Sequence, residues 1–179
     1  GQELHISKHG FVRRAPWRVV CVEADKAVFE FVSTVGTFSI FPYAFRLTVT
    51  YSLDDRKLRA EFCVENLGGS PFCFQLGGHP AIALPNWDDA QPLDGYLRLE
   101  GNPTHVLRAG EQGCLELDTF PVPLNADGLV PLTVDTFSHE ALIFDNHQVS
   151  AATVLTPSGQ PVARVESTAP VWLFWSPQG

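Results

Sequence analysis

The chain has 179 residues and a formal net charge of −8, from 20 acidic and 12 basic residues. Its 45% hydrophobic and 18% charged residues exclude a disordered chain and are typical of one globular domain spanning residues 1–179. The acidic balance and the lack of a basic stripe argue against nucleic acid as a partner. No apolar run is long enough for a membrane span and no signal peptide is visible, so we expect no membrane partner and a cytoplasmic location.

Alternation of apolar and polar residues predicts β-strands along most of the chain. In chain order, strands are expected at residues 17–23, 27–33, 45–53, 58–65, 72–76, 96–100, 141–144, 150–156, 161–166 and 171–175. Residues 45–53 and 58–65 each show one apolar face and flank a polar turn, which predicts an antiparallel hairpin. Many short strands without helical spacing predict an all-β fold, either a sandwich or a barrel.

The four cysteines show no C-x-x-C spacing, so the sequence carries no cysteine-based metal or redox motif. Cys21 and Cys73 lie in apolar surroundings and are expected to be small core residues. Cys63 falls on the polar face of its strand. Reduced thiols are favoured over disulfides, as is usual for a cytosolic protein.

His79 stands out because Gly77 and Gly78 precede it and Pro80 follows it. The glycines allow a close approach to a ligand or a positive φ, and the proline restricts the residue before it. The imidazole is therefore expected to be held in one pose at a strand end, as suits a general acid or base. The alternative is a turn histidine that only caps the strand. His9 could likewise line a polar pocket or lie in a solvated loop.

Other signals of catalytic chemistry are weak. The six histidines show no zinc-binding spacing, and the sequence has neither a G-x-S-x-G elbow nor a phosphate-binding glycine loop. We therefore expect no metal and no cofactor. The four tryptophans offer either a stacking surface for a sugar ring or ordinary core packing: Trp17, Trp87, Trp172 and Trp175.

Together these motifs resemble the aldose 1-epimerase (galactose mutarotase) superfamily, in the LacX-like branch near the hexose-6-phosphate epimerases. The resemblance is carried by segments that follow one another in the family's order over nearly the whole chain: residues 9–13 (HGFVR), 41–47 (FPYAFRL), 66–68 (NLG), 76–81 (LGGHPA), 138–144 (SHEALIF) and 175–177 (WSP). The Gly-Gly-His-Pro segment makes it fairly specific.

The resemblance implies an antiparallel β-sandwich of the galactose mutarotase type and an isomerase that interconverts the α and β anomers of a hexose. His79 matches the family's general acid, and His9 matches its second active-site histidine, near the anomeric centre. Arg13 matches an arginine that faces the phosphate of sugar phosphates. His139 lies where many members have an Asp-His pair that binds a sugar hydroxyl. The acidic position is Ser138 here, so Glu140 or Asp145 would have to replace it.

The family's general-base glutamate falls beyond residue 179, and family members also extend upstream of residue 9. We therefore expect an internal portion of a longer mutarotase-like domain. Glu166 or Glu140 would have to act as the base if this chain alone were active. The alternative is a carbohydrate-binding β-sandwich without turnover. Missing strands would leave open sheet edges, which favours a homo-oligomer. In both of these readings the partner is a monosaccharide, a hexose or a hexose phosphate, and a third reading is a β-sandwich interaction domain with no sugar site.

Overall fold

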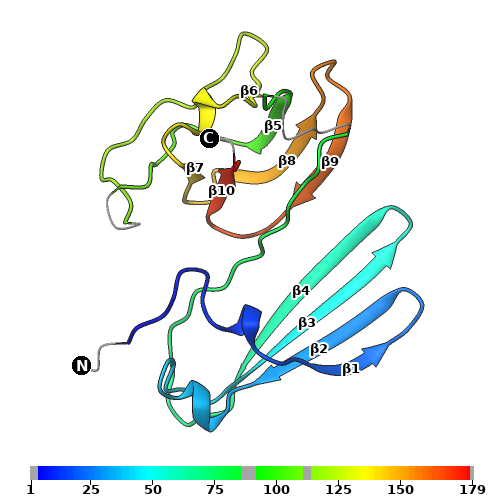
Figure 1. Cartoon of the computed structure of the whole chain (residues 1–179), viewed down its shortest axis with the longest axis vertical. Helices are drawn as coiled ribbons and strands as arrows, with labels where there is room; N and C mark the ends of the chain where they lie inside the picture. The colour runs from blue at the N-terminus through cyan, green and yellow to red at the C-terminus, as the bar shows by residue number, and fades with distance from the viewer. Residues whose placement is uncertain (1–3, 86–91, 111–113, 178–179) are drawn as a thin grey trace. The chain divides into compact units, whose positions relative to one another are not determined.

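The computed structural model describes residues 4–85, 92–110 and 114–177. The chain divides into two compact units, Gly1–Gln75 and Leu76–Gly179. All strand pairings recorded for the described residues are antiparallel, and helical structure there is limited to short 3-10 turns (Figure 1). The predicted all-β class is therefore confirmed. The prediction of one domain over residues 1–179 stays a prediction.

The first unit is a four-stranded antiparallel meander in the order β1-β2-β3-β4. Every strand pairs with its neighbour in the sequence, so each connection is a hairpin or a short excursion. The predicted hairpin is confirmed, with Phe45 opposite Asn66 at one end and Asp54 opposite Lys57 at the other. In chain order the elements are η1 (Val12–Arg14), β1 (Arg18–Val22), β2 (Lys26–Val32), η2 (Val35–Thr37), β3 (Phe45–Asp54) and β4 (Lys57–Asn66).

One end of this sheet carries the core of the first unit. Phe31, Phe45, Leu47 and Val49 are each at most 6% exposed, and they pack against side chains of η1 and the flanking loops. The same apolar face becomes exposed along β3 and β4, where Leu53 is 55% and Leu58 66% exposed. The expected single buried face is therefore correct for the first half of β3 and wrong for β4.

The opposite face of the first sheet carries a chain of ion pairs that crosses all four strands. Arg18 Nη2 lies 2.8 Å from Glu30 Oε1, and Arg46 Nε lies 3.1 Å from Glu30 Oε2. Arg46 also pairs with Glu65 on β4. Because Glu30 is shared by two arginines and is only 15% exposed, it joins β1, β2 and β3 at this end of the sheet.

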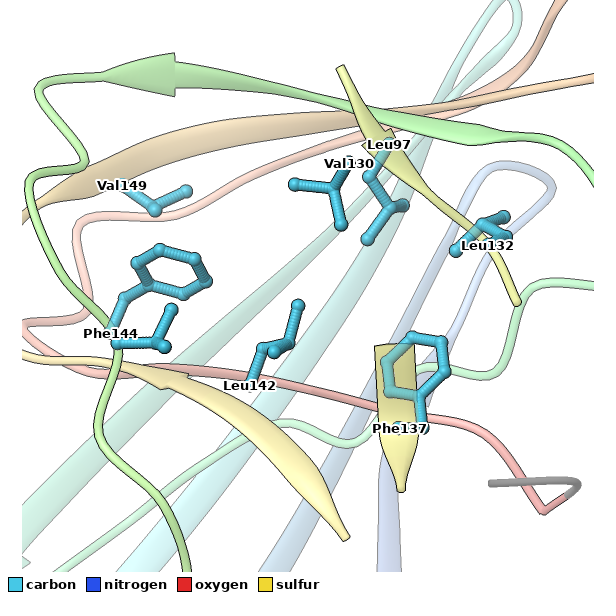
Figure 2. Close-up of a cluster of buried hydrophobic side chains, with 8 residues drawn as sticks. Leu97, Val130, Leu132, Phe137, Leu142, Phe144 and Val149 are labelled. Carbon is cyan, nitrogen blue, oxygen red and sulfur yellow. The ribbon is translucent and has the colours of Figure 1, made fainter. Parts of the chain in front are cut away.

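The second unit contains a four-stranded sheet in the order β6-β5-β8-β9 and a two-stranded sheet in the order β10-β7. Side chains from both sheets meet in one buried cluster (Figure 2), in which Phe144 and Val130 have no exposed area. In chain order the elements are β5 (Tyr96–Gly101), β6 (Val130–Pro131), η4 (Asp135–Phe137), β7 (Ala141–Phe144), β8 (Val149–Leu155), β9 (Pro161–Glu166) and β10 (Trp172–Trp175).

Three expectations about local structure were wrong. Residues 72–76 form no strand, because no described strand lies beside them to complete a hydrogen-bonded ladder. Cys73, in that segment, is exposed rather than buried, and Cys21 is only half-buried. The Cys21 thiol lies 3.2 Å from Glu23 Oε1, a contact that raises its pKa. The four cysteines are unpaired, as expected.

Candidate functional site

His79 lies in the second unit, in a stretch between residues 76 and 84 that contains neither helix nor strand, and its side chain is exposed. The predicted position at the end of a strand is therefore wrong, because residues 72–76 are not a strand. Gly77 has an ordinary φ, and a Cβ placed on it would meet nothing within 4 Å. The backbone conformation at residue 77 therefore does not require glycine. Of the two roles expected for the glycines, a positive φ or close approach of a ligand, the second remains for Gly77.

His9 lies in the first unit, in a tight turn with a left-handed backbone. The Gly10 N–H donates to the Ser7 carbonyl at 2.9 Å, and the Ser7 hydroxyl donates to the Gly10 carbonyl at 3.1 Å. His9 has φ 67° and Gly10 has φ 70°. Such a φ costs a residue other than glycine on the order of 1 kcal/mol, and strain of this kind is concentrated at functional sites.

Arg13 follows this turn within η1, and its side chain is exposed. The Trp17 indole N–H donates to the Val12 carbonyl at 3.0 Å, which fixes the 3-10 turn against the sheet. Trp17 therefore has a structural role here. Trp172 packs against the core of the second unit, Trp175 is 52% exposed, and Trp87 lies outside the described residues.

His139 lies in the turn between η4 and β7 in the second unit, and it is exposed. The Ser138 hydroxyl donates to the Asp135 carbonyl at 2.8 Å, so the side chain at the expected acidic position caps a turn. Glu140 comes next, with φ 72°. Its backbone N–H donates to the Phe137 carbonyl at 3.0 Å. This hydrogen bond stabilises the left-handed backbone of Glu140, which immediately precedes β7.

Asp145, the other acid considered for this segment, belongs to a hydrogen-bonded network that sequence reasoning did not anticipate. Its Oδ1 accepts from Gln148 Nε2 at 2.9 Å and lies 3.2 Å from His105 Nε2, and its Oδ2 accepts from Asn146 at 2.8 Å. The contact of Oδ1 with His105 therefore holds the loop after β5 to the turn after β7, and Oδ2 bonds within that turn. Nothing in the spacing of His105 and Asp145 signals this contact, since 40 residues separate them along the chain.

Glu166, considered as a replacement base, is also engaged. Arg164 forms an ion pair with Glu166 within β9 and a two-point contact with Glu100 on β5, at 2.9 and 2.8 Å. The hydrogen bonds from Arg164 lower the pKa of Glu100, and the Arg164 pKa is raised in return. These three side chains form a cross-strand ion-pair network on the sheet.

The first unit also contains an open pocket of about 460 Å³, lined mainly by apolar atoms from η1, β2 and the segment around η2. Phe11, Phe31 and Ile40 are among the apolar residues that line it, and Arg14 and Arg18 are among its polar lining residues. None of the four predicted site residues lines this pocket.

The predicted residues thus fall into two pairs along the chain. His9 and Arg13 belong to the first unit, and His79 and His139 to the second. In the described ranges, no three His, Cys, Asp or Glu side chains are grouped so that they could hold a metal ion. No helix in those same ranges combines the length and the apolar character needed to cross a membrane. The assignment of roles to the four residues stays a prediction.

Comparison with protein families gives a match to the family described as aldose 1-epimerase, over residues 2–179. Among curated proteins, the plasmid-encoded and chromosomal forms of Protein LacX from Lactococcus lactis subsp. lactis are each 25% identical over 175 residues. The match covers 96% of this chain and 58% of each relative, so the chain spans less than two thirds of their length.

Solved structures give the same result for the fold. A galactose mutarotase-like protein from Lactobacillus casei ATCC 334 matches with a TM-score of 0.83 and 26% identity, over 97% of this chain and 60% of that one. A galactose mutarotase related enzyme from Lactobacillus acidophilus matches with a TM-score of 0.78 and 24% identity, over 98% of this chain and 59% of that one. The predicted galactose mutarotase-like antiparallel β-fold is confirmed.

Proposed function

This chain belongs to the aldose 1-epimerase family, and we propose that it serves the interconversion of the α and β anomers of a hexose. The observation that carries the proposal is the family match over residues 2–179. The LacX proteins and the Lactobacillus casei structure support it at 25% and 26% identity. The chain spans less than two thirds of these relatives, so the activity of the whole protein is part of the proposal.

In the proposed reaction, His79 donates a proton to the ring oxygen while a base takes the proton from the anomeric hydroxyl. The bond between the anomeric carbon and the ring oxygen breaks, the aldehyde end rotates, and the ring closes with the other configuration. Proton donor and acceptor exchange roles on closure, so no proton is gained or lost. An imidazole suits this work because its protonated form donates a proton and its neutral form accepts one.

His9 is proposed as the second histidine, near the anomeric centre, and its left-handed backbone supports this role. That conformation is one that a histidine adopts at a cost, which is consistent with selection for the position of the ring rather than for stability. His139 is proposed to contact a sugar hydroxyl from the turn before β7.

Glu140 is proposed as the carboxylate of this segment. Asp145 is the other acid considered for this segment, and its two oxygens contact Gln148, Asn146 and His105. Glu166 is the other residue considered as the base, and it pairs with Arg164. We choose Glu140 for its place in the chain. Glu140 adjoins His139 and has the strained φ of 72°. It is also the proposed base if this chain alone catalyses the exchange.

The substrate is proposed to be a free hexose or a hexose phosphate. A role of Arg13 in binding a phosphate would favour the hexose phosphate. Its guanidinium is exposed on η1, where it is accessible to a phosphate. Comparing glucose with glucose 6-phosphate in the Arg13→Gln variant tests this. Loss of affinity for the phosphorylated sugar alone would support the sugar-phosphate reading, and equal affinities for both would contradict it. A cytoplasmic location fits either substrate and is part of the proposal.

The deciding experiment measures anomer exchange of glucose and galactose by NMR, for the chain and for His79→Asn. His147→Asn is the matched control, since His147 is also exposed and has φ 58°, which asparagine adopts readily. Removing a general acid is expected to lower the rate about a hundredfold. The control should keep the full rate.

Exchange that is equal in the two variants would contradict the role of His79. Sugar binding without any accelerated exchange would instead favour the alternative, a carbohydrate-binding β-sandwich. Glu140→Gln then separates two roles for that residue. Loss of rate with unchanged binding supports a base, and loss of binding supports a contact to a sugar hydroxyl.

A further inference from the structure

β4 is an open edge strand of unusual length. It occupies one end of the order β1-β2-β3-β4, and among the described strands β3 is the one that pairs with it. Its ten residues match β3 without a register shift, and nine of the ten are exposed. A long, regular edge presents a row of backbone N–H and C=O groups that can pair with another strand.

The other sheet edges among the described strands are protected. β1 has five residues and a register shift between Val19 and Cys21. β9 begins at Pro161 and pairs with β8 through another shift. β6 has two residues, and β7 and β10 have four each. Short strands, bulges and proline block edge pairing, and β4 has none of them. Charged side chains are a further means, but those of β4 are of both signs, so they disfavour a neutral or like-charged strand more than a strand whose charges match them.

The side chains of β4 complement a second copy of the same strand. Lys57, Arg59, Glu61 and Cys63 lie on the polar face, and Leu58, Ala60 and Phe62 on the apolar face, as their partners on β3 show. When two copies of β4 run antiparallel with Ala60 opposite Ala60, Arg59 lies opposite Glu61 and Leu58 opposite Phe62, each twice. Opposite charges and apolar pairs directly across two strands are stabilising.

Neighbouring registers are less favourable. A shift of one residue would place the apolar face of one copy beside the polar face of the other. A shift of two residues in either direction keeps the apolar faces together but places Glu61 opposite Glu61 or Arg59 opposite Arg59. A shift of four residues places Arg59 opposite Glu65, whose carboxylate already pairs with Arg46. Arg59 and Glu61 are recorded in an ion pair only with each other, at 3.0 Å, and are 72% and 56% exposed.

We propose that β4 pairs with β4 of a second copy of this chain, antiparallel and about a two-fold axis at Ala60. The pairing joins two four-stranded sheets into one eight-stranded sheet. It also brings together the apolar surfaces around Leu58 and Phe62, which are 66% and 42% exposed in one copy. The two-fold axis closes the assembly, because the remaining edge of each sheet is the short, bulged β1.

A charge-swap cycle on the 179-residue chain tests the proposal, with the dimer dissociation constant measured by sedimentation velocity. Arg59→Glu and Glu61→Arg each place like charges opposite one another twice, so each is expected to weaken the dimer about tenfold. The double variant restores opposite charges and should return to within about threefold of the original value. Arg98→Glu is the control, since it makes the same change of charge on the exposed face of β5.

A chain that stays monomeric up to near-millimolar concentration overturns the proposal and leaves this edge to a different partner. A dimer whose dissociation constant does not respond to either single change also overturns it. Single variants that weaken the dimer without rescue in the double variant would refute the proposed register. Urea unfolding of each variant shows that the fold is intact, because an exposed ion pair contributes little to stability.

Discussion

Gln148 joins the loop after β5 to the turn between β7 and β8, and replacing its side chain should lower the free energy of unfolding. Its side chain is 7% exposed, and its Oε1 accepts from the backbone N–H groups of Thr104 at 2.8 Å and His105 at 3.1 Å. Its Nε2 donates to Asp145 at 2.9 Å. In Gln148→Leu both N–H groups lose their acceptor. A buried unsatisfied donor costs about 1 to 3 kcal/mol. Because water can reach these partly buried groups, we expect a total loss of about 2 to 3 kcal/mol.

Urea unfolding gives the size of this loss, and hydrogen exchange locates it. Amides of β5 and β8 in the second unit should exchange faster, while those of β2 and β3 should not change. Gln160→Leu is the control, since Gln160 is exposed in the turn after β8 and makes both of its recorded hydrogen bonds through the backbone. Gln148→Glu keeps the acceptor but faces Asp145 with a second carboxylate. A change below about 0.5 kcal/mol in Gln148→Leu would refute the reasoning.

Two further predictions concern β5. The Glu100 pKa is lowered chiefly by its hydrogen bonds from Arg164, so its contribution to stability is present above its unfolded pKa and is lost as pH falls through the folded value. In Arg164→Gln the Glu100 pKa should rise towards its ordinary value, as a carbon-13 NMR titration measures; an unchanged pKa would contradict the assignment. Gly101 has φ +124°, and a Cβ there would lie 2.4 Å from the Gln148 carbonyl oxygen. Gly101→Ala should therefore lower the free energy of unfolding by about 1 to 3 kcal/mol, whereas Gly77→Ala, in open space, should leave it unchanged, and equal effects would count against this account.

Strands could be predicted from the sequence where apolar and polar residues alternate and where the segment also pairs with a neighbouring strand. The β3–β4 hairpin was predicted because both strands alternate and a polar turn joins them, and the structure begins and ends each strand within one residue of the prediction. Alternation does not say which face is covered. Leu58 and Phe62 follow the same pattern as Leu47 and Val49, yet they are exposed because no described part of the first unit lies over them.

The candidate site was predictable only as residue types. The segment around His79 has the composition of a strand but forms none, since a strand requires a partner that the residues themselves do not specify. The left-handed backbones of His9 and Glu140 were not predictable either, because local hydrogen bonds to Ser7 and Phe137 stabilise conformations that these residue types usually avoid. The network of His105, Asp145 and Gln148 joins distant segments that share no motif.

The contrast in connectivity between the two units has a consequence for how the chain folds. Each strand of the first unit pairs with its immediate neighbour in the sequence, so its sheet can form once residue 66 is available. In the second unit, β5 pairs with β8, and β7 pairs with β10, which ends at Trp175. Local pairings form faster because less chain entropy is lost in closing them. During synthesis we expect the sheet of the first unit to form while the second unit is still emerging, and the β7–β10 pair to form only after residue 175 is available.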